Sequence, residues 1–264
     1  MKPFRAARRG KKLDLRPMIM KKKLVVLTGA GISAESGFET FRDTGGLWEK
    51  YPVEQVATPE GWLRDPDLVT DFYNGLRKQL PTAQPNAGHL VLAEMEQDYD
   101  VTVITQNVDD LHERAGSHRV IHLHGELMRV CSSRDPDNPR CWETLTADRL
   151  EVRHGEKAKD GSLLRPWIVW FGEAVPNLDL AAREVEQADI FAVIGSSLNV
   201  SPAAGLIRYA PADSPVFLID PKPVRVKVAN ILGGKSEAEM MRILKLDDAW
   251  YALVPATEDR NTIM

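Results

Sequence analysis

The chain has 264 residues, a formal net charge of −4, and proportions of apolar and charged residues typical of globular proteins. It has no apolar run long enough to span a membrane, and its two cysteines, Cys131 and Cys141, are too few for a disulfide-stapled secreted scaffold. We therefore expect a protein of the reducing cytoplasm, with one large domain and a smaller insert.

Basic residues gather at the start of the chain. Residues 1–23 carry ten Lys and Arg against one acidic residue, Asp14. A stretch of this kind is typical of a disordered tail or an over-extended start, of a basic arm for anionic partners, or of an organellar presequence. Because Met18 and Met20 stand just before the first apolar run, we favour the first interpretation, and we base no function on residues 1–20.

The first apolar run, Leu24–Thr28, predicts a buried parallel strand, and Gly29, Gly31 and Ala34 follow it with G-x-G-x-x-A spacing. In the dinucleotide fingerprint the first glycine allows a tight turn and the second lets the backbone approach a pyrophosphate. The small third residue lets the helix pack on the strand. Glycine-rich turns after strands are common, so this pattern alone leaves a simple turn equally open.

The segment after the fingerprint differs from that of a dehydrogenase. Residues 35–48 are rich in glycine, polar and aromatic residues, whereas a hydride-transferring domain carries a second strand that ends in an acidic residue. The segment predicts a long ordered loop, which is usually functional. We expect Phe41 and Arg42 beside a bound cofactor; the alternative is a surface excursion.

Strands and helices then alternate, which predicts an α/β fold with a Rossmann-like doubly wound parallel sheet and ligands at the carboxyl ends of its strands. Residues 126–168 lose this rhythm and are crowded with Arg, Asp, Pro and Gly, so they predict a small inserted module. The pattern predicts helices at 53–63, 66–80, 87–98, 178–188 and 202–210, and strands at 101–104, 120–123, 190–194 and 216–219.

Two polar stretches follow predicted strands. Gln106, Asn107 and Asp109 come directly after strand 101–104, where side chains reach a ligand crevice or, alternatively, cap the next helix. His124 is a candidate general base because histidine titrates near neutral pH. His122 shares its strand face. A metal site would need a third ligand, which is not evident, and a buried histidine bonded to the backbone is the ordinary alternative.

At this point a family resemblance can be named. The segments GAGISAESGFETFRDTGGLW, TQNVDDLHERAG, HLHGE, IVWFGEAVP and GSSLNVSPAAG occur here in the order found in the sirtuins, which are NAD-dependent protein deacylases. The match runs from about Lys22 to the region of Lys245. The chain resembles the class III sirtuins of bacterial type. The resemblance implies acylated-lysine protein substrates and the release of nicotinamide and 2′-O-acyl-ADP-ribose.

The resemblance also implies roles for individual residues. His124, rather than His122, is the implied base, with Asn107 as a second catalytic residue. The resemblance also implies an NAD-binding domain formed by residues 21–125 and 169–250, with a C-terminal tail at 251–264. The implied NAD-binding residues are Gly29, Ala30, Gly31, Ser33, Ala34, Phe41, Arg42, Trp48, Gln106, Asn107, Asp109, Gly195, Ser196, Ser197 and, with an aspartate where many members have asparagine, Asp220. The implied substrate-binding residues are Ala57, Tyr73, Leu76, Arg77, Val169, Trp170, Phe171 and Gly172, of which Val169 to Gly172 hold the substrate backbone by β-augmentation.

The inserted module departs from the family pattern. Most sirtuins hold a structural zinc with two C-x-x-C pairs, whereas this chain has only Cys131 and Cys141, with His154 nearby. A structural zinc needs four ligands. We therefore expect no metal, and two inert, partly exposed thiols.

The acyl-binding segment departs as well. Class III sirtuins carry Tyr-x-x-Arg to grip an acidic acyl group, but here Leu76 stands three residues after Tyr73. Arginine is hard to replace in bidentate carboxylate recognition, so we favour neutral acyl groups over succinyl. Because i+3 and i+4 share one helix face, Arg77 remains an alternative carboxylate ligand.

Competing functions remain at this stage. A mono-ADP-ribosyltransferase could use the same NAD site, and a non-catalytic NAD sensor is disfavoured by His124 with Gln106, Asn107 and Asp109 intact. A dehydrogenase is disfavoured by the missing ribose-binding acid. We expect a monomer without a membrane segment or a specific nucleic-acid partner.

Overall fold

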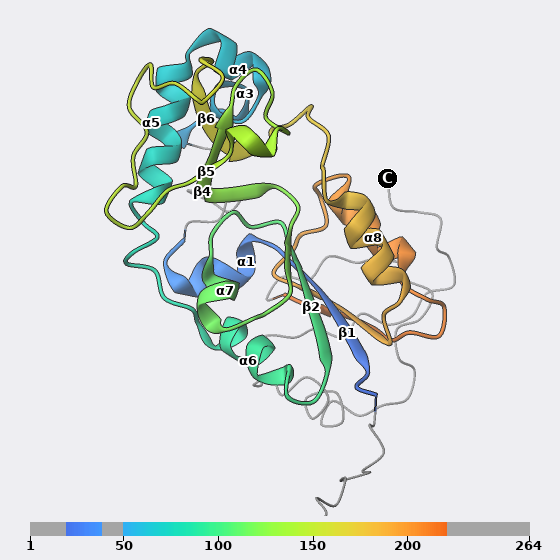
Figure 1. Cartoon of the computed structure of the whole chain (residues 1–264). Helices are drawn as coiled ribbons and strands as arrows, with labels where there is room; N and C mark the ends of the chain where they lie inside the picture. Colours follow the sequence, from blue (N-terminus) through green and yellow to red (C-terminus); the bar gives the residue numbers. More distant parts are fainter. Residues whose placement is uncertain (1–19, 39–49, 221–264) are drawn as a thin grey trace, which may run out of the picture.

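The computed structural model of the chain describes residues 20–38 and 50–220 (Figure 1). The expectations for the basic leader up to residue 19, for residues 221–264, and for Phe41, Arg42 and Trp48 lie outside these ranges. No helix within the described ranges has the length and apolar character needed to cross a bilayer.

The central sheet has five parallel strands in the order β3-β2-β1-β7-β8. In its middle, β1 (Lys23–Thr28) pairs with β2 (Asp100–Thr105) and β7 (Ile190–Ile194). The edges are β3 (Val120–His122) and β8 (Val216–Ile219). The chain fills one half of the sheet and then returns to fill the other, so β1 and β7 flank the topological switch point. The doubly wound α/β fold is confirmed.

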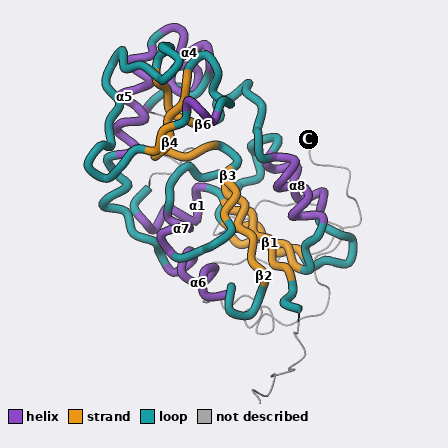
Figure 2. Tube along the Cα trace, in the orientation of Figure 1, coloured by secondary structure: helices purple, strands orange, loops and turns teal. Residues whose placement is uncertain are grey.

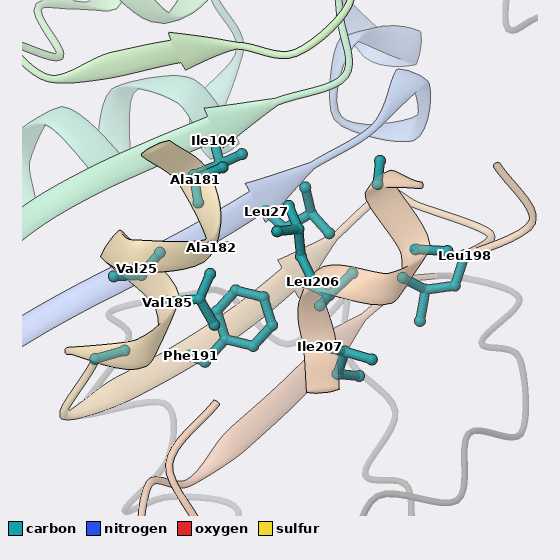
Figure 3. Packing of buried hydrophobic residues seen from close by; sticks show 14 of the residues in the cluster. Val25, Leu27, Ile104, Ala181, Ala182, Val185, Phe191, Leu198, Leu206 and Ile207 are labelled. Carbon is teal, nitrogen blue, oxygen red and sulfur yellow. The ribbon is translucent and has the colours of Figure 1, made fainter. Parts of the chain in front are cut away.

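Alternate residues of β1 point to opposite sides of the sheet, and helices cover both faces. Val25 and Leu27 pack with α8 (Leu178–Glu186) and the 3-10 helix η3 (Ala203–Tyr209), as Figure 3 shows. The opposite face, with Leu24 and Val26, is covered by α6 (Ala87–Met95). The shorter helices of the large lobe are α1 (Ala30–Ser33), η1 (Ala34–Ser36) and α7 (Leu111–Ala115).

A second, smaller lobe stands at one end of the central sheet (Figures 1 and 2). Its antiparallel sheet has the order β5-β4-β6, formed by β4 (Gly125–Ser132), β5 (Glu143–Thr144) and β6 (Leu164–Ile168). Val56, Trp62 and Phe72 share a core with Leu127 and Trp170, so helices that come much earlier in the chain also belong to this lobe. These helices are α3 (Val53–Val56), α4 (Pro59–Arg64) and α5 (Pro66–Arg77), and the lobe also contains the 3-10 helix η2 (Pro139–Cys141).

Several element boundaries differ from those predicted. The helix expected over 53–63 is two helices, because Thr58 caps α4 by accepting a hydrogen bond from the Gly61 N–H at 3.0 Å, and Pro59 fits its first turn. Asp65 caps α5 by accepting a hydrogen bond from the Leu68 N–H at 2.9 Å. The helix predicted at 202–210 is a 3-10 helix.

Polar and aromatic contacts hold the insert. Arg149 pairs with Glu143 and Glu156, and Ser132 donates to the Asp160 carboxylate at 2.6 Å. Cys131 and Cys141 are both buried and form no disulfide, so the expectation of partial exposure is wrong: the small lobe covers both residues. Within the described ranges, no cluster of three His, Cys, Asp or Glu residues could hold a metal ion.

Candidate active site

A cavity of about 430 Å³ lies at the carboxyl ends of β1, β2 and β7 and continues to the small lobe. Its volume is that of an ordinary small-molecule site, and its place at the switch point is where α/β sheets bind ligands. It brings together most of the predicted site residues: Gly29, Ala30, Gly31, Ala34, Ala57, Tyr73, Leu76, Gln106, Asn107, His124, Val169, Trp170, Phe171, Gly172, Gly195, Ser196, Ser197 and Asp220.

The fingerprint glycines allow close contact between the segments that follow β1 and β7. The Gly31 N–H donates to the Gly195 carbonyl at 2.9 Å, and a Cβ built on Gly31 would lie 2.7 Å from the Gly195 Cα. A Cβ on Gly29 would lie 2.7 Å from the Gly195 carbonyl oxygen. Glycine at both positions is therefore required by this loop contact as well as by any ligand, and the resulting backbone cradle at the switch point fits a dinucleotide.

Behind the cavity wall, three polar side chains form a chain of hydrogen bonds. The Asn107 side-chain amide donates to the Ser33 hydroxyl, and the hydroxyl donates to the Asp109 carboxylate, both at 3.0 Å. Burial raises the pKa of Asp109, opposed by its bonds to the Leu111 N–H and to Ser33. Ser33 and Asp109 do not line the cavity; they orient Asn107, which does.

His124 lies in the cavity with one ring nitrogen fixed. Its Nδ1 is 3.0 Å from the Gln106 carbonyl oxygen, which can only accept, so Nδ1 carries the proton and the neutral ring presents a lone pair at Nε2. Burial lowers the pKa of His124, and the bond to Gln106 only partly opposes this. The ring is therefore neutral near pH 7, as a general base must be.

His122 is buried beside the site rather than in it. Its Nδ1 is 3.0 Å from the Asn107 carbonyl oxygen, and its Nε2 is 2.8 Å from a Glu113 carboxylate oxygen. The resemblance treated His122 as structural. Its bond to the backbone of Asn107 ties it to the loop that bears a site residue.

The end of the cavity in the small lobe is apolar, with Ala57 and Leu76 in its wall. The Trp170 indole N–H donates to the Tyr73 hydroxyl at 3.1 Å. Arg77 does not reach this space: it is fully buried, and its guanidinium donates to the Leu127 carbonyl at 2.6 Å and to Asn74 at 2.9 Å. The alternative that Arg77 takes over a substrate carboxylate is therefore unsupported by this geometry.

The structure adds site residues that the sequence interpretation missed. Glu173 lies in the wall, held by Arg165 through paired contacts of 2.8 and 3.1 Å, and it accepts from the Trp170 N–H at 2.8 Å. Its position within the quoted segment IVWFGEAVP was the available signal. The other additions are Val108, Ile168, Val175, Val200, Ser201 and Pro202.

The segment after β6 runs between the two lobes. The Val169 N–H donates to the His124 carbonyl and the Phe171 N–H to the Ala57 carbonyl, both at 3.0 Å. These two donors are therefore already used and are not available for the β-augmentation that the resemblance implies for residues 169–172.

The sequence matches a known protein family. The Sir2 family model matches residues 29–202, which span the fingerprint, His124 and the loop after β7. The chain belongs to the Sir2 family. The resemblance found in the sequence is thus confirmed.

Individual relatives are similar over most of their length. An NAD-dependent protein deacylase of Bacteroides thetaiotaomicron is 66% identical over 203 residues, which cover 77% of this chain and 87% of the relative. The crystal structure of a Sir2 homolog–NAD complex is 40% identical, with a TM-score of 0.70 over 85% of this chain and 89% of its own. A Sir2 variant with a deacetylated p53 peptide and 3′-O-acetyl-ADP-ribose is 31% identical, with a TM-score of 0.67 over 85% and 92%.

Proposed function

We propose that this chain, an NAD-dependent protein deacylase of the Sir2 family, removes uncharged acyl groups from lysine side chains in preference to succinyl. The observation that carries the proposal is the cavity itself. It joins the backbone cradle of Gly31 and Gly195 to a neutral His124 and to an apolar end in the small lobe.

The cavity residues divide the work. Bound NAD supplies a nicotinamide leaving group and ribose hydroxyls. His124 accepts a proton at Nε2 from a ribose hydroxyl, because Nδ1 is already protonated toward Gln106. The Asn107 side chain, oriented through Ser33, holds the ribose and nicotinamide end. The apolar wall with Val108 and Ile168 excludes water from the reacting centre.

The acyl preference follows from the charges at the small-lobe end. Among the described residues that line the cavity, none is a lysine or arginine, and Glu173 adds a carboxyl group to the wall. A succinyl carboxylate there would lose its hydration without gaining a cation, which is costly. The Tyr73 hydroxyl accepts from the Trp170 indole N–H and can still donate its own hydrogen, but one neutral donor does not replace a cation.

The test compares acetyl-, butyryl-, longer-acyl- and succinyl-lysine peptides with NAD, with products identified by mass spectrometry. We expect deacylated peptide and O-acyl-ADP-ribose from the neutral acyl peptides, and little from succinyl. Efficient succinyl removal would contradict the acyl preference. ADP-ribose attached to protein, without deacylation, would instead favour a mono-ADP-ribosyltransferase.

We also propose the cytoplasm as the site of action and a monomer as the working unit. Two buried cysteines without a disulfide fit a reducing compartment. We propose that residues 21–125 and 169–250 carry the NAD-binding domain and 126–168 the insert, with the exception of α3, α4 and α5, which pack with the insert in the smaller lobe.

A further inference from the structure

Two histidines hold two consecutive carbonyl groups of the loop after β2. His124 Nδ1 bonds to the Gln106 oxygen and His122 Nδ1 to the Asn107 oxygen, each at 3.0 Å. The same loop carries the Asn107 side chain into the cavity and Asp109 behind it. The position of these two carbonyls therefore sets the position of the NAD-facing groups.

The hydrogen-bond partners of the two ring nitrogens indicate the protonation state of His122. Nε2 lies 2.8 Å from a Glu113 carboxylate oxygen, and the partner of Nδ1 is a backbone carbonyl. Both partners are acceptors, and an imidazole carries a hydrogen on each nitrogen only when it is protonated. The geometry around His122 is thus that of an imidazolium.

The groups packed around the ring are consistent with this charge. Burial, the largest influence, lowers the pKa of His122, but the hydrogen bond and charge of Glu113, the charge of Glu126 and the Asn107 carbonyl together raise it above 6.5. Asp109 also faces it, and the nearby His112 is kept neutral by burial, which lowers its pKa well below the usual value. The pKa of Glu113 is lowered: its burial acts in the opposite sense, but the hydrogen bond and charge of His122 prevail.

We propose that His122 is a positioning residue for NAD binding: held as an imidazolium by Glu113, it fixes the Asn107 carbonyl and with it the loop that faces the cofactor. This role rests on the proposed function, since it acts through the NAD site. When His122 loses its proton, the hydrogen that remains goes to the charged Glu113 carboxylate, which is the stronger acceptor. The bond to the Asn107 carbonyl is then lost, and NAD affinity falls as the pH rises through the raised pKa of His122.

The variants separate charge from hydrogen bonding. Glu113→Gln removes the charge but still donates to a neutral Nε2, so Nδ1 keeps its bond to Asn107. Glu113→Ala removes the partner altogether, at a side chain that is 43% exposed, so nothing holds the ring in place or fixes which nitrogen carries the single hydrogen. His122→Asn keeps an amide donor near the place of Nδ1 and cannot titrate, whereas His122→Val removes the donor.

The matched control is Glu96→Gln. Glu96 forms another histidine–carboxylate pair, with His118, at 2.5 Å. That histidine is 87% exposed and neither residue lines the cavity. A general effect of removing the negative charge beside a histidine would appear in this variant too.

The experiment measures NAD dissociation constants by calorimetry between pH 6 and pH 9, and the nitrogen shifts of the six histidines by NMR. We expect both nitrogens of His122 protonated at neutral pH in the wild type. We expect Glu113→Ala and His122→Val to weaken NAD binding at neutral pH by about tenfold, the scale of one charged hydrogen bond. Glu113→Gln and His122→Asn should bind nearly as wild type and lose the alkaline decline, and Glu96→Gln should change neither.

Two results would overturn the proposal: a neutral His122 at neutral pH, or wild-type NAD affinity in Glu113→Ala. Both readouts are independent of turnover. Failure to deacylate any peptide would therefore count against the proposed function, whereas a wild type that deacylates while Glu113→Ala binds NAD normally would count against His122 alone.

Discussion

At the scale of single residues, we expect the environment of His124 to set the pH range of activity. Its folded pKa is lowered from 6.5, chiefly by burial. A general base works when neutral, so we expect kcat/KM to be full at pH 7 and to fall only below pH 6.5, as His124 gains a proton. The pH profile with an acetyl-lysine peptide measures this. An acid limb centred above 6.5 would show that another group controls the reaction.

We expect the proposed acyl preference to be reversible at Leu76. Leu76→Arg places a cation in the apolar wall beside Tyr73, and we expect the ratio of succinyl to butyryl turnover to rise by about tenfold or more, as a charged pair in a shielded site allows. Competition between the two peptides, read by mass spectrometry, measures the ratio. The control Leu63→Arg adds the same charge at a side chain that is 82% exposed on α4, and should leave the ratio unchanged.

The neighbouring Arg77 marks a limit of sequence interpretation. From the spacing alone, positions 76 and 77 were both able to share the face of Tyr73. The structure turns Arg77 inward because the Leu127 carbonyl, 50 residues away in the chain, accepts its Nε hydrogen. No local pattern announces such a partner. By contrast, contiguous motifs such as Gly29–Ala34 and Gln106–Asp109 could be placed from sequence because each immediately follows its own strand.

At the scale of elements, Asn86 joins α6 to α1, the short helix that contains the second fingerprint glycine. Its side-chain oxygen caps the helix through the Gly88 N–H at 2.9 Å, and its amide donates to the Ile32 carbonyl at 2.6 Å. We expect Asn86→Ala to lower the free energy of unfolding by about 1–3 kcal/mol, measured by urea denaturation. Asn138→Ala, which removes an exposed cap bond to the Arg140 N–H, should cost less. Equal losses would mean that the contact between the two elements contributes nothing.

Elements with local signals were predicted better than those with distant partners. The buried strands of the central sheet were found within a residue or so of their ends, because each is a continuous apolar run. The break before α4 could have been found from Thr58 and Pro59. The sheet of β4, β5 and β6 could not have been found from the sequence. Its strands β4 and β6 pair across a long intervening segment, and the polar composition of this region hides the period of two that is typical of strands.

At the scale of the whole molecule, the two lobes share one cavity and divide its chemistry. The large lobe supplies the backbone cradle and the polar loop after β2, while the small lobe supplies the apolar end with Leu76 and Trp170. The segment 169–172 bonds to both His124 and Ala57, so it links the two parts across the site. We therefore expect substitutions in different lobes to change cofactor binding and the proposed acyl preference separately.

The contact between the β1 and β7 loops provides a test of this division. Gly31→Ala would place a Cβ 2.7 Å from the Gly195 Cα, a backbone atom that can yield only if the whole loop moves. We expect a loss of about 1–3 kcal/mol in unfolding free energy, as for other overpacked sites, together with weaker NAD binding. Denaturation and calorimetry on the same samples measure both.

The control is a glycine in the other lobe. Gly75 lies within α5, and a Cβ there meets no atom within 4 Å. Gly75→Ala should therefore stabilise the protein by up to about 1 kcal/mol through reduced backbone freedom, with NAD affinity unchanged. If Gly31→Ala instead behaved like Gly75→Ala in both measurements, the β1 and β7 loops would have room to separate. The close contact between them would then not be what shapes the cofactor cradle.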